Sequence, residues 1–288
     1  MPSFKQILYP VDFSEQNRAM APYVACMAAR YKARVTMLHA LEIPAGAYPG
    51  WAEYPGLMDL PAMLEERKGQ LDSFVKSELE TVATTRLIFE GAPSQVISDY
   101  AAKEKVDLIM MPTHGYGPFR RFLLGSVTAK TLHDSHCPVW TSAHVLETPA
   151  PFAGYRTVLC AVDLSSTSLP PLRWAREFAG EQGATLKLLH AIPAGQPAAG
   201  FDIEGTRFRS FLFEMAREEL AKLQSEAGTK LETLLEGGEV AAGVRKAAGE
   251  NRADLVIIGR GVMQEAFGRM RTNVYSIIRE SPCPVISV

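Results

Sequence analysis

The sequence predicts an α/β protein built from two tandem doubly wound domains, each with a five-stranded parallel sheet and helices on both faces. Three observations support this fold class. The chain has 288 residues, enough for two domains of ordinary size. Short apolar runs alternate with segments of helical length, which is typical of β-α-β units. Finally, five sequence blocks occur twice in the same order, so the two halves are copies of one unit.

The repeated blocks show how the halves correspond. Residues 7–14 (ILYPVDFS) match 158–165 (VLCAVDLS), and the Leu-His-Ala block at 38–40 recurs at 189–191. Three later blocks, which begin at 101, 107 and 137 in the first half, begin at 247, 254 and 283 in the second. A proline-containing stretch lies between the copies at 143–151. We therefore expect domains at 1–146 and 152–288, joined by a linker.

The elements of the first half follow from local patterns. The apolar run 5–11 predicts a strand, and the helix expected over about 15–31 has Ala, Met and Val on one face. A second strand is expected at 35–39. The charged segment 64–70 is most simply the solvated face of a helix over about 58–83.

The remaining elements of the half are shorter. A strand is expected at 86–90, followed by glycine and proline punctuation and a short helix that ends near 104. Residues 106–111 are continuously apolar, as in a strand buried on both faces. A helix over about 126–135 and a strand at 138–142 complete the half. Ligands of such sheets bind at the carboxyl ends of the strands, where the strand order reverses.

Composition excludes several classes of protein. The chain has 30 basic and 32 acidic residues, so it has no overall positive field for nucleic acid, and we expect no nucleic-acid partner. No apolar run reaches the roughly 20 residues of a membrane span, and the N-terminus has no signal-peptide core. Four cysteines are scattered without a Cys-x-x-Cys pair, which indicates reduced thiols and no structural zinc. We therefore expect a cytoplasmic location and no membrane partner.

A glycine-containing loop between the strand at 106–111 and the helix at 126 is the strongest candidate for an anion site. Gly115 allows the backbone to approach a ligand, and Gly125 allows a strained turn. Ser126 is the expected N-cap, and the free N–H groups of 126–128 would face the sheet edge. The alternative is an ordinary surface loop before a capped helix. Neither a P-loop nor a complete dinucleotide motif occurs.

These motifs resemble the universal stress protein family. Nucleotide-binding members carry G-x-x-G-x9-G-[ST] between the fourth strand and fourth helix, and Gly115 with Gly125-Ser126 fits its last two-thirds. The blocks PVDFS at 10–14 and CPV at 137–139 also look like the family, as does Gly91-x-Pro93. The resemblance implies a stress-response protein that binds an adenine nucleotide, ATP or a similar one, with or without Mg²⁺.

The resemblance also implies which residues hold the nucleotide. Asp12 would contact the adenosine part, and the backbone near Ala40 would meet adenine. The full set expected in the first domain is Pro10, Asp12, Ala40, Gly91, Pro112, His114, Gly115, Gly125, Ser126 and Val127. The family's domains commonly pair through their last strands, which implies intramolecular pairing of 137–141 with 283–288. Whether the chain also forms a homodimer is left open.

The first domain departs from the family motif at one position. Pro112 stands where the motif has its first glycine, and proline has no N–H. If that N–H normally meets a phosphate, its loss costs roughly 1.5–3 kcal/mol, or about 10- to 100-fold in affinity. If the glycine only provides close packing, the loss is small.

The second domain departs differently. It keeps a glycine at 259 but has Arg271-Thr272 in place of Gly125-Ser126. Because arginine does not readily adopt a glycine-only turn and would crowd phosphates, this copy looks degenerate for the same nucleotide. The alternative is a different anion site formed by Arg260, Arg269 and Arg271.

Other candidate residues have two interpretations each. Asp12 and Asp163 are either ligand contacts or turn and cap residues. His39 and His190 are more simply hydrogen-bonded core residues than catalytic groups. The loop 43–56 is either a lid or a segment packed on the other domain, and Tyr48, Trp51 or Tyr54 could stack on a base.

Two other function classes remain alternatives to nucleotide binding. A slow ATPase would need a water-orienting group and a metal, and only His114, Asp12 and Ser126 are candidates nearby. They form no recognised catalytic constellation. A non-nucleotide interaction module would have both sites degenerate.

Overall fold

The computed structural model describes residues 4–42, 60–115, 124–144, 152, 154–193, 203–260 and 269–288. The predicted loop at 43–56, with Tyr48, Trp51 and Tyr54, lies outside the described residues. In the first half the elements are β1 (Gln6–Pro10), α1 (Glu15–Tyr31), β2 (Arg34–Leu41), α2 (Leu60–Ser73), β3 (Thr84–Glu90), α3 (Pro93–Lys103), β4 (Leu108–Pro112), α4 (Ser126–Asp134) and β5 (Val139–Ser142).

The second half repeats the same order of strands and helices. Its elements are β6 (Thr157–Val162), α5 (Leu169–Gln182), β7 (Thr185–Ile192), α6 (Ile203–Ala227), β8 (Glu232–Gly237), α7 (Val240–Glu250), β9 (Leu255–Ile258), α8 (Arg269–Glu280) and β10 (Val285–Ser287). Among the described residues, no helix is long and apolar enough to cross a membrane.

The strands form one sheet in the order β3-β2-β1-β4-β5-β10-β9-β6-β7-β8. All neighbouring strands within each half are parallel, and β5 pairs antiparallel with β10 at the centre. The strand order reverses between β1 and β4, and again between β6 and β9, which are the positions where such sheets bind ligands. The structure confirms the doubly wound α/β fold and the pairing of the halves through their last strands.

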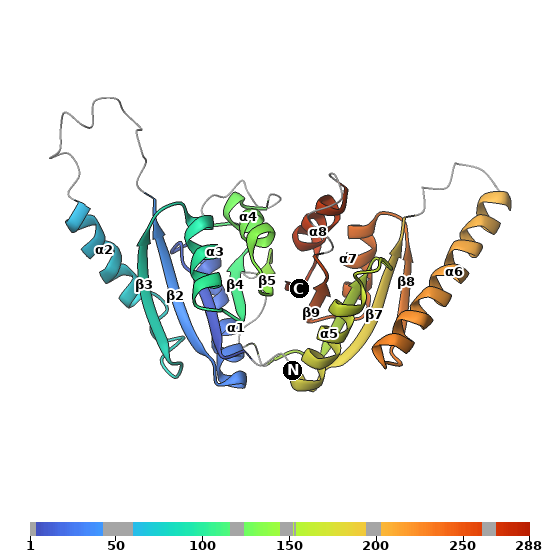
Figure 1. The fold of residues 1–288 in the computed structure, drawn as a ribbon, viewed down its shortest axis with the longest axis horizontal. Helices are drawn as coiled ribbons and strands as arrows, with labels where there is room; N and C mark the ends of the chain where they lie inside the picture. Colours follow the sequence, from blue (N-terminus) through green and yellow to red (C-terminus); the bar gives the residue numbers. More distant parts are fainter. Residues whose placement is uncertain are drawn as a thin grey trace, which may run out of the picture.

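Helices cover both faces of this sheet (Figure 1). Alternate residues of β1 serve opposite faces: Ile7 and Tyr9 belong to one core cluster, and Leu8 to the other. The first cluster contains residues of α1, α2, α5 and α6, and the second contains residues of α3, α4, α7 and α8. Figure 1 shows α4 and α8 facing each other at the middle of the molecule, with α2 and α6 at its ends.

The expected helix over 58–83 is wrong at its C-terminal end, because α2 stops at Ser73. Two residues later, Val75 has a φ of 43°, which an α-helix cannot contain. Phe74 and Val75 are almost fully buried, so the chain turns there to place both side chains in the core. Tertiary packing therefore ends a helix that its charge pattern would extend.

Candidate functional site

A cavity of about 320 Å³ lies at the carboxyl ends of β1 and β4, where the strand order of the first half reverses. We call it the first-domain cavity. The structure brings nine of the ten expected site residues together around it: Pro10, Asp12, Ala40, Pro112, His114, Gly115, Gly125, Ser126 and Val127. Gly91 is not among its lining residues and lies in the turn after β3 with a φ of 138°.

Asp12 is held by the turn that starts α1. Its Oδ1 accepts hydrogen bonds from the N–H of Ser14 at 2.9 Å and from its hydroxyl at 2.6 Å. The Ser14 hydroxyl oxygen in turn accepts the N–H of Asn17, so Ser14 is the N-cap of α1. Phe13, between Asp12 and Ser14, has a φ of 64°, an uncommon backbone conformation that turns the chain sharply after β1. Asp12 thus supports a cap and lines the cavity at the same time.

Gly115 lies against the other carboxylate oxygen of Asp12. A Cβ atom built on Gly115 would be 1.9 Å from Asp12 Oδ2, closer than any real contact allows. Glycine is therefore required here for close approach to the carboxylate. This contact joins the end of β1 to the loop after β4.

Gly125 does not adopt the strained turn that the sequence predicted for it. Its φ is −61° and its ψ is 144°, which any residue can adopt, so that prediction was wrong. A Cβ there would be 3.2 Å from the carbonyl oxygen of Thr113, so space is what favours glycine. Gly125 is also the N-cap of α4, and the helix begins at Ser126, which corrects the assignment of Ser126 as the cap.

The N-terminus of α4 contributes hydrogen-bond donors to the first-domain cavity. Gly125, Ser126, Val127 and Thr128 all line it. The first N–H groups of a helix have no acceptor within the helix and carry the positive end of its dipole. The Thr128 hydroxyl donates to the Pro112 carbonyl at 3.0 Å, which fixes this first turn against β4. The arrangement suits an anionic ligand.

Three histidines, two at the first-domain cavity and one in the second half, lie against neighbouring oxygens. His39 donates from Nδ1 to the Val11 carbonyl at 2.7 Å, and burial lowers the pKa of His39, so the ring is neutral near pH 7. His190 makes the equivalent bond to the Val162 carbonyl at 2.8 Å. His114 is buried, and its Nδ1 lies 3.0 Å from the Thr113 hydroxyl. Both repeated histidines therefore anchor the second strand to the end of the first.

Sequence reasoning missed Asn17, which also lines the first-domain cavity. Its side chain is 1% exposed, and its Nδ2 donates to the Pro10 carbonyl at 2.9 Å. Its buried Oδ1 has no hydrogen-bond partner among the described residues. An asparagine in the first turn of a helix gives no signal of this kind in a sequence, because only the packing of α1 on β1 brings it to the cavity.

The described residues around the first-domain cavity offer few carboxylates or other metal ligands. Among the described residues around the first-domain cavity, Asp12 is the only acidic side chain. The described part of the chain contains no group of three His, Cys, Asp or Glu side chains that could hold a metal ion. A magnesium ion bound here would therefore depend mainly on the phosphates of a nucleotide, with Asp12 as the one carboxylate among the described lining residues.

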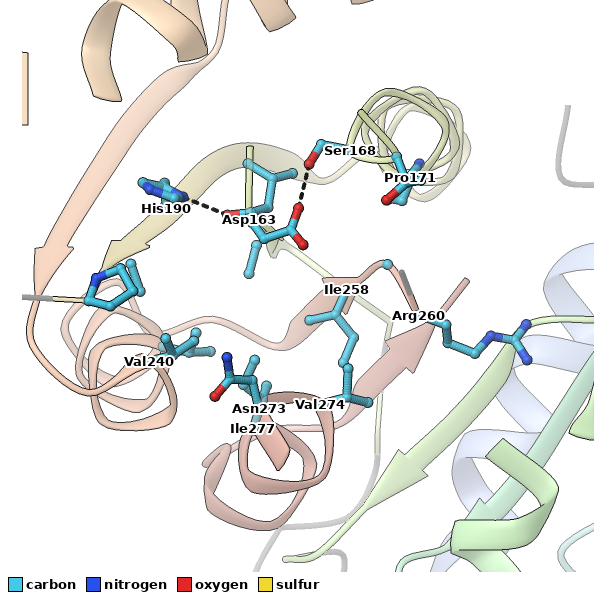
Figure 2. Close-up of a pocket in the computed structure, with 17 residues that line it drawn as sticks. Asp163, Ser168, Pro171, His190, Val240, Ile258, Arg260, Asn273, Val274 and Ile277 are labelled. Carbon is cyan, nitrogen blue, oxygen red and sulfur yellow. Dashed lines mark hydrogen bonds between the residues drawn. The ribbon is translucent and has the colours of Figure 1, made fainter. Parts of the chain in front are cut away.

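The second half has a corresponding cavity of about 160 Å³ at the carboxyl ends of β6 and β9 (Figure 2). We call it the second-domain cavity. The Thr113 N–H donates to the Ser142 carbonyl and the Arg260 N–H to the Val288 carbonyl, so Gly259 occupies the position of Pro112. α8 begins at Arg269, which places Arg271 inside the helix. Arg271 is therefore a helical residue and does not replace a glycine in a turn, so the predicted reason for a degenerate second site was wrong.

Arg260 does not form the anion site considered as an alternative. Its guanidinium donates to the carbonyl oxygens of Ser135 and Cys137 in the first domain. Figure 2 shows the side chain extending away from the cavity toward the first half. The side chains of Arg269 and Arg271 lie outside the described part of the structure.

Comparisons with known proteins agree with this architecture. A sequence model described as the Universal stress protein family matches residues 3–142 and 154–288. A universal stress protein of Methanocaldococcus jannaschii is 30% identical over 138 residues, 47% of this chain and 80% of that protein. One of Thermus aquaticus is 30% identical over 142 residues, 47% of this chain and 96% of that protein.

The fold of the whole chain also has a counterpart among solved structures. The crystal structure of a universal stress protein from Archaeoglobus fulgidus covers 98% of this chain and 95% of its own, with a TM-score of 0.65 and 21% identity. The likeness therefore extends over both halves. With two matched segments, this chain belongs to the universal stress protein family and contains two copies of its domain.

Proposed function

We propose that the first domain, residues 1–146, binds an adenine nucleotide, and that the second domain, residues 152–288, supports it without taking the same nucleotide. The observation that carries the proposal is the first-domain cavity itself. It joins a carboxylate, Asp12, and the N-terminus of α4 at the point where the strand order reverses. The family resemblance assigns the adenosine part to the surroundings of Asp12 and Ala40.

The chemistry of this cavity favours binding over turnover. The N–H groups at the start of α4 would hold phosphate oxygens, and a magnesium ion bound with the nucleotide would neutralise part of their charge. ATP hydrolysis needs a group that orients water beside the γ-phosphate. The loop between β4 and α4 has a single histidine, His114, and it forms no recognised catalytic constellation with its neighbours. Occupancy would instead shift the population of conformations that a partner recognises.

Calorimetric titration of the full chain with ATP, AMP and cyclic AMP tests the proposal. We expect one nucleotide per chain. Gly125→Arg should weaken binding at least about tenfold, because a side chain at 125 meets the Thr113 carbonyl. Gly249→Arg is the matched control, since nothing lies within 4 Å of a Cβ built there.

Three results would count against this function. Absence of binding by all three nucleotides at millimolar concentration would exclude it. Two nucleotides per chain would contradict the assignment to one domain. Release of ADP over hours, lost in His114→Ala, would support the ATPase alternative instead.

A further inference from the structure

The second-domain cavity has apolar walls. Six aliphatic side chains from β6, α7, β9 and α8 surround it: Val162, Val240, Val244, Ile258, Val274 and Ile277. Five of them are at most 8% exposed, so the walls are set by the packed core of the domain. Figure 2 shows Asp163 and Ser168 on one side of the space and Val240, Ile258 and Val274 on the other.

Besides Arg260, the titratable side chains among the described residues that line this space are Asp163 and His190, together with the neutral polar residues Thr167, Ser168 and Asn273. Asp163 Oδ1 accepts the N–H of Ser165 at 3.0 Å and the hydroxyl of Ser168 at 2.8 Å. A carboxylate has about four acceptor positions, so these two bonds leave capacity for a ligand. His190 gives its Nδ1 hydrogen to the Val162 carbonyl, so that hydrogen is already used within the protein.

Asp163 carries a negative charge at neutral pH. Burial alone would raise its pKa, but the hydrogen bonds from Ser165 and Ser168 hold the pKa below its usual value. The carboxyl group is therefore ionised, and the side chain is exposed at the edge of the cavity, where a ligand can reach it.

The features that favour an anion in the first domain are displaced in the second. Arg260 is the only cation among the described lining residues, and its guanidinium binds carbonyls of the first domain. The helices α4 and α8 also line their cavities with different turns. Val127 is the second residue of α4, whereas Asn273 is the fifth residue of α8, so the N–H of Asn273 is already used within the helix.

We infer that the second-domain cavity binds a small amine, a molecule with an apolar body and a protonated amino group but no phosphate. The ammonium group donates to the Asp163 carboxylate, and the apolar body fills the space between the valine and isoleucine side chains. The volume of about 160 Å³, half that of the first-domain cavity, fits a ligand smaller than a nucleotide. This inference does not depend on nucleotide binding in the first domain.

Three probes of the same shape test the charge requirement: 2-phenylethylamine, 2-phenylethanol and 3-phenylpropionate. Each is titrated into the full chain and followed by isoleucine and valine methyl resonances. We expect the amine to shift the methyl signals around the second-domain cavity and to bind about 10- to 100-fold more tightly than the alcohol. The carboxylate should not bind, because it meets Asp163.

Asp163→Asn is the decisive variant. Its amide oxygen can still accept from Ser165 and Ser168, so the fold is kept, but the charge is lost. We expect the amine to bind at least about tenfold more weakly, while Asp12→Asn in the first domain leaves its affinity unchanged. Failure of the amine to bind near 10 mM, equal binding of amine and carboxylate, or full affinity in Asp163→Asn would each overturn the inference. Nucleotide titration reports separately on the first domain.

Discussion

At the scale of single residues, Gly115 approaches Asp12 so closely that no side chain fits between them. In Gly115→Ala the new methyl group would lie 1.9 Å from Asp12 Oδ2, so the carboxylate must move. Its bonds to Ser14, and with them the cap of α1, would be disturbed. We expect the free energy of unfolding to fall by about 1–3 kcal/mol in urea titrations, with weaker nucleotide binding.

A matched glycine variant controls for this substitution. Gly69→Ala lies within α2, and no atom is within 4 Å of a Cβ built there. Because alanine is the better helix former, we expect a gain of up to about 1 kcal/mol and unchanged nucleotide affinity. Equal stability of the two alanine variants would mean that Asp12 adapts to the extra methyl group without cost.

Pro112 removes one backbone donor at the edge of the first-domain cavity. Successive N–H groups of a strand point in opposite directions, and the Thr113 N–H donates to Ser142 on β5. An N–H at position 112 would therefore point to the other side, toward β1. We expect Pro112→Gly to bind nucleotide about 10- to 100-fold more tightly by calorimetry. Unchanged affinity would show that the family's glycine serves packing. As a control, Pro171→Gly in the second domain should leave the nucleotide affinity unchanged.

The site was only partly predictable at this scale. The spacing of Gly115 and Gly125 located the loop correctly, because both glycines are needed for close approach. The reason assigned to Gly125 was wrong, since a sequence does not show whether a glycine is needed for its φ angle or for space. Asn17 was missed because its place at the cavity depends on how α1 packs against β1.

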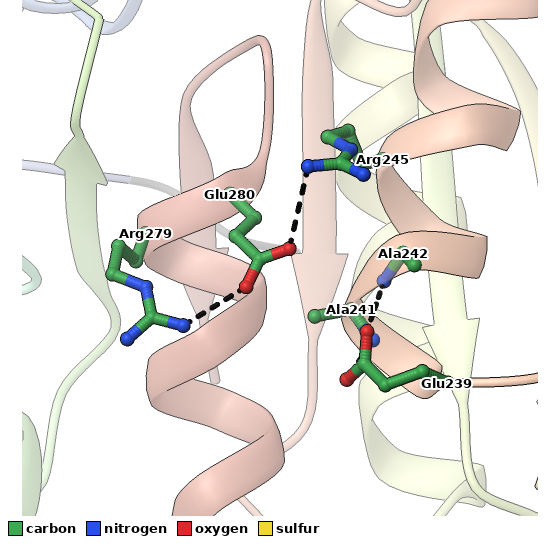
Figure 3. Close-up of polar contacts among 6 residues, drawn as sticks. All are labelled: Glu239, Ala241, Ala242, Arg245, Arg279 and Glu280. Atoms are coloured by element: carbon green, nitrogen blue, oxygen red, sulfur yellow. Dashed lines mark hydrogen bonds and ion pairs between the residues drawn. The ribbon is translucent and has the colours of Figure 1, made fainter. Parts of the chain in front are cut away.

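At the scale of elements, a single side chain caps α7. Glu239 accepts the N–H groups of Ala241 at 3.0 Å and Ala242 at 2.7 Å (Figure 3). Separately, Glu280 at the end of α8 forms ion pairs with Arg245 of α7 and with Arg279. Glu239→Ala leaves both donors without their acceptor. We expect a loss of about 0.5–2 kcal/mol in the free energy of unfolding, measured in urea.

Two further variants sharpen the test of this cap. Glu239→Gln keeps one acceptor oxygen and should lose less than the alanine variant. Arg245→Ala removes a 3.6 Å ion pair from a partly exposed side chain and should change stability by no more than about 0.5 kcal/mol. If Glu239→Ala cost no more than Arg245→Ala, the cap would contribute nothing measurable.

Most elements could be predicted from the sequence, because their patterns are local. The apolar run 106–111 and the punctuation at 91–94 located β4 and the start of α3. Element ends that depend on tertiary packing were not predictable. α2 stops where buried Phe74 and Val75 turn the chain, and the position of Arg271 within α8 could not be read from the offset of the repeat.

At the scale of the whole molecule, the two domains share one sheet, and the core cluster on each of its faces contains residues from both halves. β5 and β10 pair at its centre, and Trp140 on β5 donates to the Tyr155 hydroxyl at 2.8 Å. Phe4 of the first half lies 6.4 Å from the Phe178 ring of the second, centroid to centroid. The family resemblance predicted the strand pairing, but these aromatic contacts depend on the packing of helices across the join. The domains therefore stabilise each other.

Arg260 makes two polar contacts across this join. Its guanidinium donates to the Ser135 and Cys137 carbonyls, and burial lowers its pKa. Because the guanidinium is charged and largely buried, removing these contacts is costly. We expect Arg260→Ala to lower the free energy of unfolding by about 1.5–3 kcal/mol in urea titrations followed by tryptophan fluorescence. Arg260→Lys should not restore it, because an ammonium group cannot reproduce the planar fork that serves both carbonyls. Arg279→Ala, which removes a pair with the adjacent Glu280, is the control, and an equal loss there would mean that Arg260 contributes only surface charge.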